Sequence, residues 1–457
     1  MKAGAESLLG LLAARLDDAP DRVAIAVMPD GAADAVRLSW ADLAAASLGV
    51  ARALEARGLS RGARVVHVGG HSPDWIVVDL ACLLGGFVHA PLHVDSGAAE
   101  LARQVEWLAP DLLVWSGGPV AAGAATLGRL GAPHRVLDVA RWRETAGEGL
   151  AGADRKPSPA DLPALRAEVA RRLAATDPHA PAVIFLSSGT TGRPRGFVHS
   201  QAGLAANAMA AAAVFLDEPE DVRLSWLPAS HSLAHTGDLS TALVRGSCLN
   251  VVGDRKRVLD ACRFLPPTVI LGVPAFFERL ARAAETGAIG DLRAALGGRV
   301  RVCVSGGASL RQRTRDAFAA RGVALVEGYG LAEAGPVVTL ASPRESLPGS
   351  VGRALPGVEL RLGSGDELLV RTPSRALEVV VAEGEPPPRG DDDGWIATGD
   401  TATIGPDGSV RITGRSVDTL VLSTGTKVPP EEVERALAED PLVAQVCVCG
   451  EGSRAPV

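Results

Sequence analysis

"FLSSGTTGRPRGFVHS", residues 185–200, decides how the rest of the chain is interpreted. Its central positions hold glycines, small hydroxyl residues and two arginines around a proline, which suits neither a helix interior nor the apolar alternation of a strand. The apolar residues 182–186, which lead into its glycine-rich centre, predict a buried strand. Glycines allow close backbone approach, and exposed N–H groups with hydroxyls can enclose an anion. The stretch therefore predicts a phosphate-binding loop, with Arg193 and Arg195 available to neutralise charge.

The spacing of this loop differs from that of the P-loop, which has four residues between its first Gly and Gly-Lys. Gly189 and Gly192 are separated by two residues, and no lysine follows. If only five residues of the stretch 185–200 were considered, a Gly/Ser/Thr turn that binds no ligand would be a fair alternative.

Composition limits the classes of protein to consider. The chain has 457 residues, 47% hydrophobic and 22% charged, which predicts a large core divided among two or more domains. A net charge of −7 and the lack of a basic run argue against a nucleic-acid partner or an anionic membrane surface. No apolar run approaches the roughly 20 residues that span a bilayer. Residues 1–22 predict an amphipathic surface helix rather than a cleaved signal, and hence a cytoplasmic protein with at most weak peripheral membrane association.

The six cysteines are scattered, without the spacing of a metal site or a disulfide framework. We interpret Cys447 and Cys449 as residues on one face of a core strand.

Helical and strand-like segments alternate along most of the chain. A helix is expected over 38–59, and helix, turn and strand over 74–92. Further strands are expected at 63–70, 111–116, 182–187, 222–228, 268–274, 299–307 and 324–330. This alternation predicts an α/β fold with parallel sheets. Beyond residue 350 the short strands expected at 351–362, 367–373, 377–384 and 410–415 indicate a more β-rich part.

"SSGTTGRPRG" (187–196) resembles the Ser-Gly-Thr-Thr-Gly-x-Pro-Lys-Gly signature of the adenylate-forming superfamily, which includes acyl-CoA synthetases, aryl-CoA ligases and peptide-synthetase adenylation domains. Further family-like blocks follow in the family's order, and "LPASHS" with "LVLSTGTKVPPEEVE" is most similar to the long-chain acyl-CoA synthetase branch. These blocks are "WLPASHSLAHTGDL" (226–239), "PTVILGVPAFFERL" (267–280), "VSGGASL" (304–310), "VEGYGLAEAGP" (326–336), "DGWIATGD" (393–400) and "ITGRSVDTLVLSTGTKVPPEEVE" (412–434).

The resemblance implies a large N-terminal adenylate-forming domain over 1–413, built of several subdomains, one of them small and β-barrel-like. Residues 414–457 would be the hinge and an incomplete C-terminal lid domain. None of the four lysines, Lys2, Lys156, Lys256 and Lys427, matches the lysine that the family's lid delivers to the adenylating carboxylate. We expect truncation of a longer chain in preference to a degenerate paralogue.

The resemblance also implies an activity with ATP, Mg²⁺ and coenzyme A: a carboxylic acid becomes an acyl-adenylate and then a thioester. Glu333 would ligate Mg²⁺. Asp400 would accept from the ribose hydroxyls, assisted by Arg415. Gly306, Gly307 and Ala308 would flank adenine, and Tyr329, between Gly328 and Gly330, would lie against the purine ring. The β- and γ-phosphates would be held by Ser187, Ser188, Gly189, Thr190, Thr191, Gly192 and Arg195.

His231 occupies a position where the family has a histidine or an aromatic residue beside the substrate carboxylate. With His235 it forms an i, i+4 pair of the kind that binds zinc on a helix, but no third ligand is evident. We therefore assign His231 to the reaction and His235 to the structure, and treat the other seven histidines as ordinary.

Three positions depart from the family pattern. The phosphate-loop lysine is Arg195, the threonine expected before Glu333 is Ala332, and the hinge residue, usually Asp or Lys, is Val417. Losing the threonine hydroxyl removes one hydrogen bond to a charged group, about 1.5–3 kcal/mol.

We therefore expect an AMP-forming ligase of a fatty or related acid, active in fatty-acid metabolism. The alternatives are a non-catalytic paralogue that binds nucleotide and acyl groups, and an adenylation enzyme for an amino or aryl acid. The amino-acid alternative lacks support, because "WLPASHSLAH" has no Phe-Asp pair.

Overall fold

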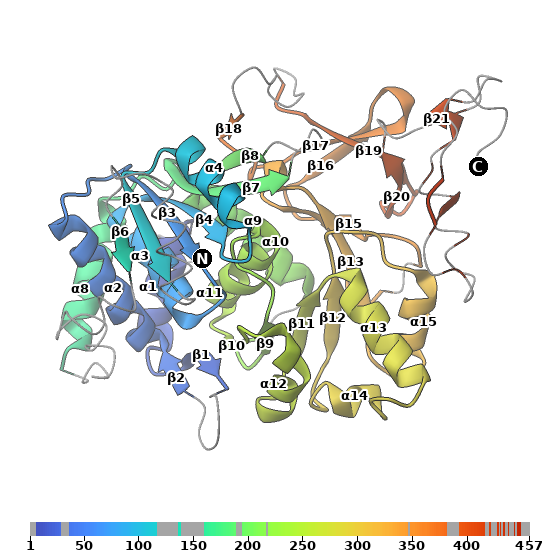
Figure 1. The fold of residues 1–457 in the computed structure, drawn as a ribbon, viewed down its shortest axis with the longest axis horizontal. Helices are drawn as coiled ribbons and strands as arrows, with labels where there is room; N and C mark the ends of the chain where they lie inside the picture. The colour runs from blue at the N-terminus through green and yellow to red at the C-terminus, as the bar shows by residue number, and fades with distance from the viewer. Residues whose placement is uncertain are drawn as a thin grey trace.

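The computed structural model describes residues 6–28, 36–116, 136–138, 160–188, 194–215, 218–345, 348–381 and 393–415, with 420–421, 427–428, 430, 433–434, 437, 443 and 446–448. Within these ranges the predicted α/β fold is confirmed: two large, mostly parallel sheets are packed with helices, and smaller antiparallel sheets follow (Figure 1).

The larger sheet has parallel pairing at its centre and antiparallel strands at its edges. Its described strands, in spatial order, are β15 (Arg353–Ala354), β14 (Val337–Leu340), β13 (Leu325–Gly330), β12 (Val302–Ser305), β11 (Val269–Gly272), β9 (Val222–Ser225), β10 (Cys248–Val251), β1 (Val23–Val27) and β2 (Val36–Ser39).

The second large sheet carries the strand that leads into the predicted phosphate loop. Its described strands, in spatial order, are β18 (Glu378–Val380), β8 (Pro194–Ser200), β7 (Pro181–Ser188), β4 (Val88–His93), β3 (Arg64–Gly69), β5 (Leu112–Ser116) and β6 (Val136–Asp138). Strands β7, β4, β3, β5 and β6 pair in parallel, while β8 pairs antiparallel with β7 and with β18.

Local sequence signals explain where helices begin and end. Helix α3 starts after the N-cap Ser72 with Pro73 in its first turn. It ends at Gly85 and is followed by the C-cap Gly86, whose φ of 68° suits a residue without a side chain. Ser39 and Asp42 form a capping box at the start of α2. The described helices are α1 (Leu8–Asp18), α2 (Trp40–Ala56), α3 (Pro73–Gly85), α4 (Ala98–Leu108), α8 (Leu162–Ala174), α9 (Gln201–Phe215), α10 (Ser232–Ala234), α11 (Thr241–Arg245), α12 (Val258–Phe264), α13 (Pro274–Glu285), α14 (Leu292–Ala295) and α15 (Gln312–Ala319).

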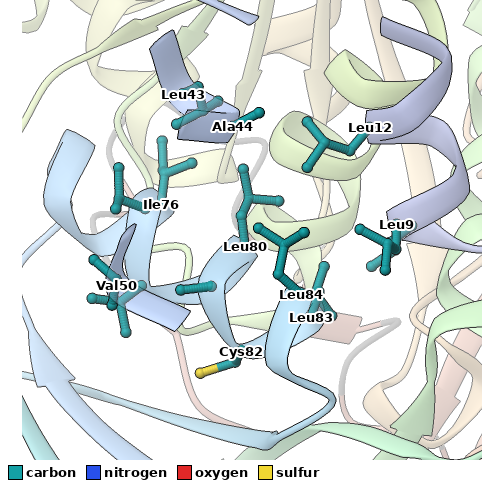
Figure 2. Close-up of a cluster of buried hydrophobic side chains, with 14 of the residues drawn as sticks. Leu9, Leu12, Leu43, Ala44, Val50, Ile76, Leu80, Cys82, Leu83 and Leu84 are labelled. Carbon is teal, nitrogen blue, oxygen red and sulfur yellow. The ribbon is translucent and has the colours of Figure 1, made fainter. Parts of the chain in front are cut away.

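One apolar cluster joins the two large sheets. It combines side chains of α1, α2, α3, α8, α9 and α11 with strands of both sheets, and Figure 2 shows its α1, α2 and α3 members. The expected amphipathic N-terminal helix is confirmed as α1: Leu8, Leu9, Leu12 and Leu16 are buried in this cluster, whereas Asp17 and Asp18 at its end are exposed. None of the described helices is both long and apolar enough to cross a membrane.

The expectation of a small β-barrel is wrong for the described residues. The strands concerned form an open antiparallel sheet in the order β16 (Glu359–Leu362), β17 (Glu367–Arg371), β19 (Ile396–Ile404) and β20 (Val410–Arg415). Strand β18, also expected in this part, pairs instead with β8 of the second large sheet, so it cannot help to close a barrel. The remaining described strands, β21 (Leu420–Val421) and β22 (Lys427–Val428), pair with each other.

Candidate active site

The predicted phosphate loop connects the two strands of a hairpin. Strands β7 and β8 pair so that Ser187 faces Arg195 and Ser188 faces Pro194. Residues 189–193, with the predicted ligands Gly189, Thr190, Thr191 and Gly192, lie outside the described residues.

The buried strand expected at 182–187 is confirmed as β7, whereas the expectation that 185–200 has no strand pattern of its own is wrong for Pro194–Ser200, which form β8. Phe185 and Phe197 pair across the hairpin and are both buried, so apolar packing makes strands of the segments on either side of the glycine-rich centre.

Five predicted site residues from separate elements interact with one another. The Tyr329 hydroxyl, on β13, donates to Asp400 Oδ2 on β19 at 2.6 Å. Arg415 Nε, on β20, lies 3.6 Å from Asp400 Oδ1, and the two residues pair in register. Glu333, in the single turn Ala332–Ala334 (η3), interacts electrostatically with Arg195, Asp400 and Arg415. Two carboxylates, two guanidinium groups and one phenol thus share one site.

The carboxylates and the guanidinium groups of this site shift the pKa of Glu333 in opposite directions. Burial raises the pKa of Glu333, helped by the charge of Asp400 and opposed by Arg195 and Arg415. Burial and the neighbouring Asp400 carboxylate raise the pKa of Tyr329 well above its ordinary value, so the phenol stays a hydrogen-bond donor. Paired carboxylates beside two arginines can hold ribose hydroxyls, a cation and phosphate oxygens together.

The predicted adenine-flanking turn follows β12 directly. Gly307 has a φ of 82°, which favours glycine, and Gly307 and Ala308 are exposed. A Cβ added to Gly306 would lie 3.2 Å from a Leu233 methyl group and 3.8 Å from the Gly328 carbonyl. The turn therefore borders both the Tyr329 strand and the segment after His231.

His231 lies in a different group of side chains from the five above. Its ring stacks on His93, at the end of β4, with centroids 6.4 Å apart and 19° between planes. Burial, His93 and Arg255 lower the pKa of His231. The described contacts of His231 do not include Glu333 or Asp400.

The backbone at His231 and His235 lacks the continuous helix that a metal-binding i, i+4 pair requires. His231 is the extended N-cap of α10, with φ −90° and ψ 132°, whereas His235 begins the π-helical turn His235–Ser240 (η1) and contacts Asp79. The i, i+4 argument requires both residues to be helical, and His231 is not. Across the ranges that the structure describes, no three His, Cys, Asp or Glu residues are grouped as metal ligands.

His199 was missed by sequence reasoning. From β8 its Nε2–H donates to the Ala332 carbonyl at 2.8 Å, so it links the strand leaving the phosphate loop to the turn of Glu333. The sequence feature that could have identified His199 is its position four residues after Arg195. The sequence alone does not show which residue His199 contacts.

The C-terminal predictions are tested only at single positions. Cys447 is exposed and outside any strand, so the expectation of a core position there is wrong. Val417 and Cys449 lie outside the described residues, and the domain boundary between 413 and 414 stays a prediction.

Two family models match the chain: AMP-binding enzyme over residues 12–377, and AMP-binding enzyme C-terminal domain over 417–457. The chain belongs to the AMP-binding enzyme family. The predicted resemblance is thereby confirmed, including its branch: the chain is 30% identical to a long-chain-fatty-acid–CoA ligase (FadD15) of Mycobacterium tuberculosis, over 95% of this chain and 78% of the relative. It is also 27% identical to an indoleacetate–CoA ligase of Aromatoleum aromaticum, over 90% of this chain and 80% of that protein.

Solved structures agree on the fold. ATP-bound MatB from Rhodopseudomonas palustris matches with a TM-score of 0.76 and 27% identity, covering 97% of this chain and 85% of that one. The anthranilate CoA ligase AuaEII, in complex with anthranoyl-AMP, matches with a TM-score of 0.80 at 19% identity, over 97% of this chain and 83% of that one.

Proposed function

We propose that this enzyme activates a fatty acid with ATP and transfers the acyl group to coenzyme A. The observation that carries the proposal is the convergence of Tyr329, Glu333, Asp400 and Arg415 with Arg195 at the phosphate-loop hairpin. The choice of a fatty acid rests on the 30% identity to the mycobacterial long-chain ligases.

In the first step a carboxylate oxygen attacks the α-phosphorus of ATP. The new O–P bond gives the acyl-adenylate, and the bond between the α-phosphorus and the bridging oxygen breaks, so that pyrophosphate leaves with the electron pair. Negative charge concentrates on the phosphoryl oxygens, where Arg195 and the hydroxyls and N–H groups of 187–192 would oppose it.

In the second step the coenzyme A thiol loses its proton to solvent or a base, and sulfur attacks the acyl carbonyl. The C–S bond forms as the C–O bond to the phosphate breaks, and AMP leaves. In the proposed arrangement His231 lies beside this carbonyl. Its lowered pKa keeps the imidazole neutral near pH 7, so it can accept a proton or donate a hydrogen bond.

The remaining residues would hold the nucleotide. Asp400 would accept from the ribose hydroxyls, with Arg415 as a donor. Gly306, Gly307 and Ala308 would flank the adenine against Tyr329.

Mg²⁺ fits this set of donors. Mg²⁺ in nucleotide sites is usually bound by one or two carboxylates together with phosphate oxygens, and Glu333 supplies such a carboxylate among cationic side chains. When bound, the ion would neutralise phosphate charge.

An aryl acid is the second candidate substrate, because the indoleacetate ligase is 27% identical over most of the chain. A paralogue that binds nucleotide without turnover is the third possibility, suggested by Ala332 in place of threonine.

The test is pyrophosphate release from ATP and Mg²⁺ with octanoate, palmitate and an aryl acid, followed by thioester formation with coenzyme A. We expect release to depend on a fatty acid, and to fall when Thr190 and Thr191 are both replaced by valine. Preference for the aryl acid would replace the fatty-acid assignment. Tight ATP binding by calorimetry without release for any acid would favour the binding paralogue.

A further inference from the structure

A chain of buried polar side chains crosses the core behind the candidate site, and the proposed chemistry does not use it. All its histidine and aspartate members have side chains at most 1% exposed. Its members, in order of contact, are Ser116, His67, His89, Asp79, His235 and Ser240. Burying so many polar groups is unfavourable unless each finds a partner, so the chain calls for an explanation.

The carboxylate of Asp79, on α3, determines the direction of the hydrogen bonds. It can only accept, so both neighbouring imidazoles donate to it: His89 Nδ1 at 2.7 Å, and His235 Nε2 at 3.2 Å from each oxygen. In a neutral His89, whose ring proton is then on Nδ1, Nε2 accepts from His67 Nδ1 at 3.1 Å. Burial raises the pKa of Asp79, but the two histidines outweigh it and hold that pKa below the ordinary value.

His235 connects this carboxylate to two parts of the candidate site. Its backbone N–H donates to the His231 carbonyl at 3.0 Å, and it begins the π-helical turn η1. Its ring meets the edge of Phe185 with centroids 5.1 Å apart, two residues before Ser187. A π-helical turn is rare and is frequently found at functional sites.

We propose that Asp79 and His235 are positioning residues of the active site. The carboxylate fixes the His235 ring, and the ring fixes both the segment of His231 and the strand that ends at the phosphate loop. This inference rests on the proposed function, because the site that it positions is the site proposed for adenylation.

Two amide substitutions at one position provide a matched test. In His235→Gln the amide nitrogen occupies the place of Nε2 and can donate to Asp79. In His235→Asn the same amide takes the place of Nδ1, on the side of Ser240, and cannot reach the carboxylate. We expect the Gln variant to keep kcat within about threefold of the wild type. The Asn variant loses a hydrogen bond to a charged group, and kcat falls about ten- to hundredfold. Asp79→Asn, which places an amide N–H₂ against a ring donor, shows the same fall.

His67→Gln is the control. His67 is as buried as His235 and belongs to the same chain of contacts, but its hydrogen bonds go to His89 and Ser116, away from η1 and β7. We expect this variant to have a lower thermal midpoint and an unchanged kcat and KM.

The assay is pyrophosphate release with the acid that the wild-type protein prefers, together with thermal unfolding of each variant. Equal kcat values for His235→Gln and His235→Asn, or a loss in His67→Gln as large as that in His235→Asn, would overturn the positioning role while leaving the proposed function intact. A wild-type protein that releases no pyrophosphate with any acid would overturn both.

Discussion

Tyr329 offers a direct test of the geometry of the candidate site. It is the only tyrosine in the chain, so tyrosinate absorbance reports on this residue alone. Its hydroxyl donates to Asp400 at 2.6 Å, and burial together with that carboxylate raises its pKa well above 10. We therefore expect the folded protein to show no tyrosinate absorbance at a pH where the tyrosine of the unfolded chain has ionised.

The same shift links stability to pH. Because the pKa is higher in the folded state, the stabilisation is complete below pH 10 and is lost as pH rises, since the unfolded chain releases the proton first. Each pH unit above 10 removes about 1.4 kcal/mol of the free energy of unfolding, until the pH reaches the raised pKa. Tyr329→Phe has no phenolic proton to lose. The free energy of unfolding of this variant should therefore decline with pH less steeply than that of the wild type, by about 1.4 kcal/mol per pH unit.

The measurement compares urea unfolding of the wild type and Tyr329→Phe at neutral and alkaline pH, with absorbance recorded on the folded wild type. Arginine, lysine and cysteine titrate in both proteins and cancel in the comparison. Tyrosinate absorbance that appears near pH 10 in the folded protein, with parallel stability curves, would refute the contact between Tyr329 and Asp400.

Three further predictions follow from other contacts. Glu333→Gln should lower pyrophosphate release by about a hundredfold or more, because the carboxylate proposed to bind the cation is lost, and a Gln variant with wild-type rates would contradict this. Ala332→Thr should raise the rate or the affinity for the adenylate by about one to two decades, through one hydrogen bond to phosphate, and unchanged kinetics would remove that role. Burial lowers the pKa of His71 and of His199 to about 4, so the unfolded chain binds protons first as pH falls below 6.5. Between pH 6.5 and pH 4 each group therefore removes about 3 kcal/mol from the free energy of unfolding. Urea unfolding across this range should show the loss, with a smaller slope in His199→Gln, and a flat profile would count against the prediction.

Local patterns in the sequence predicted most of the fold. Short, mostly apolar runs identified β5, β11 and β12, because their burial on both sides leaves an almost continuous apolar signal. Strands β3, β9 and β13 were also predicted, although each contains charged or polar residues. The hairpin strand β8 was missed, since only Phe197 and Val198 carry an apolar signal beside the glycines and arginines. The barrel-like subdomain was expected from the family resemblance, and the short strands beyond residue 350 indicated only a β-rich part. The sequence does not show which strands pair, and β18 pairs elsewhere.

The candidate site was predicted as a set of residues, and the structure adds their contacts. Tyr329 and Asp400 were assigned to different parts of the nucleotide, and nothing in either motif shows that their side chains touch. The buried histidines could not be found from the sequence. His67 and His89 lie on adjacent parallel strands, and only the strand order brings them together.

The replacement of threonine by Ala332 does not by itself argue for a binding protein without turnover. The turn that carries Glu333 is held by backbone atoms: the Ala332 carbonyl accepts from His199 at 2.8 Å, and the Glu333 carbonyl accepts from the Ala376 N–H at 2.8 Å. Neither contact involves the side chain at position 332, so an alanine there leaves the position of the Glu333 backbone fixed. The substitution therefore removes at most one contact to the bound ligand, and its effect should be a slower reaction rather than a lost one. Glu333, Asp400 and Arg415 likewise retain the side chains that the proposed chemistry requires.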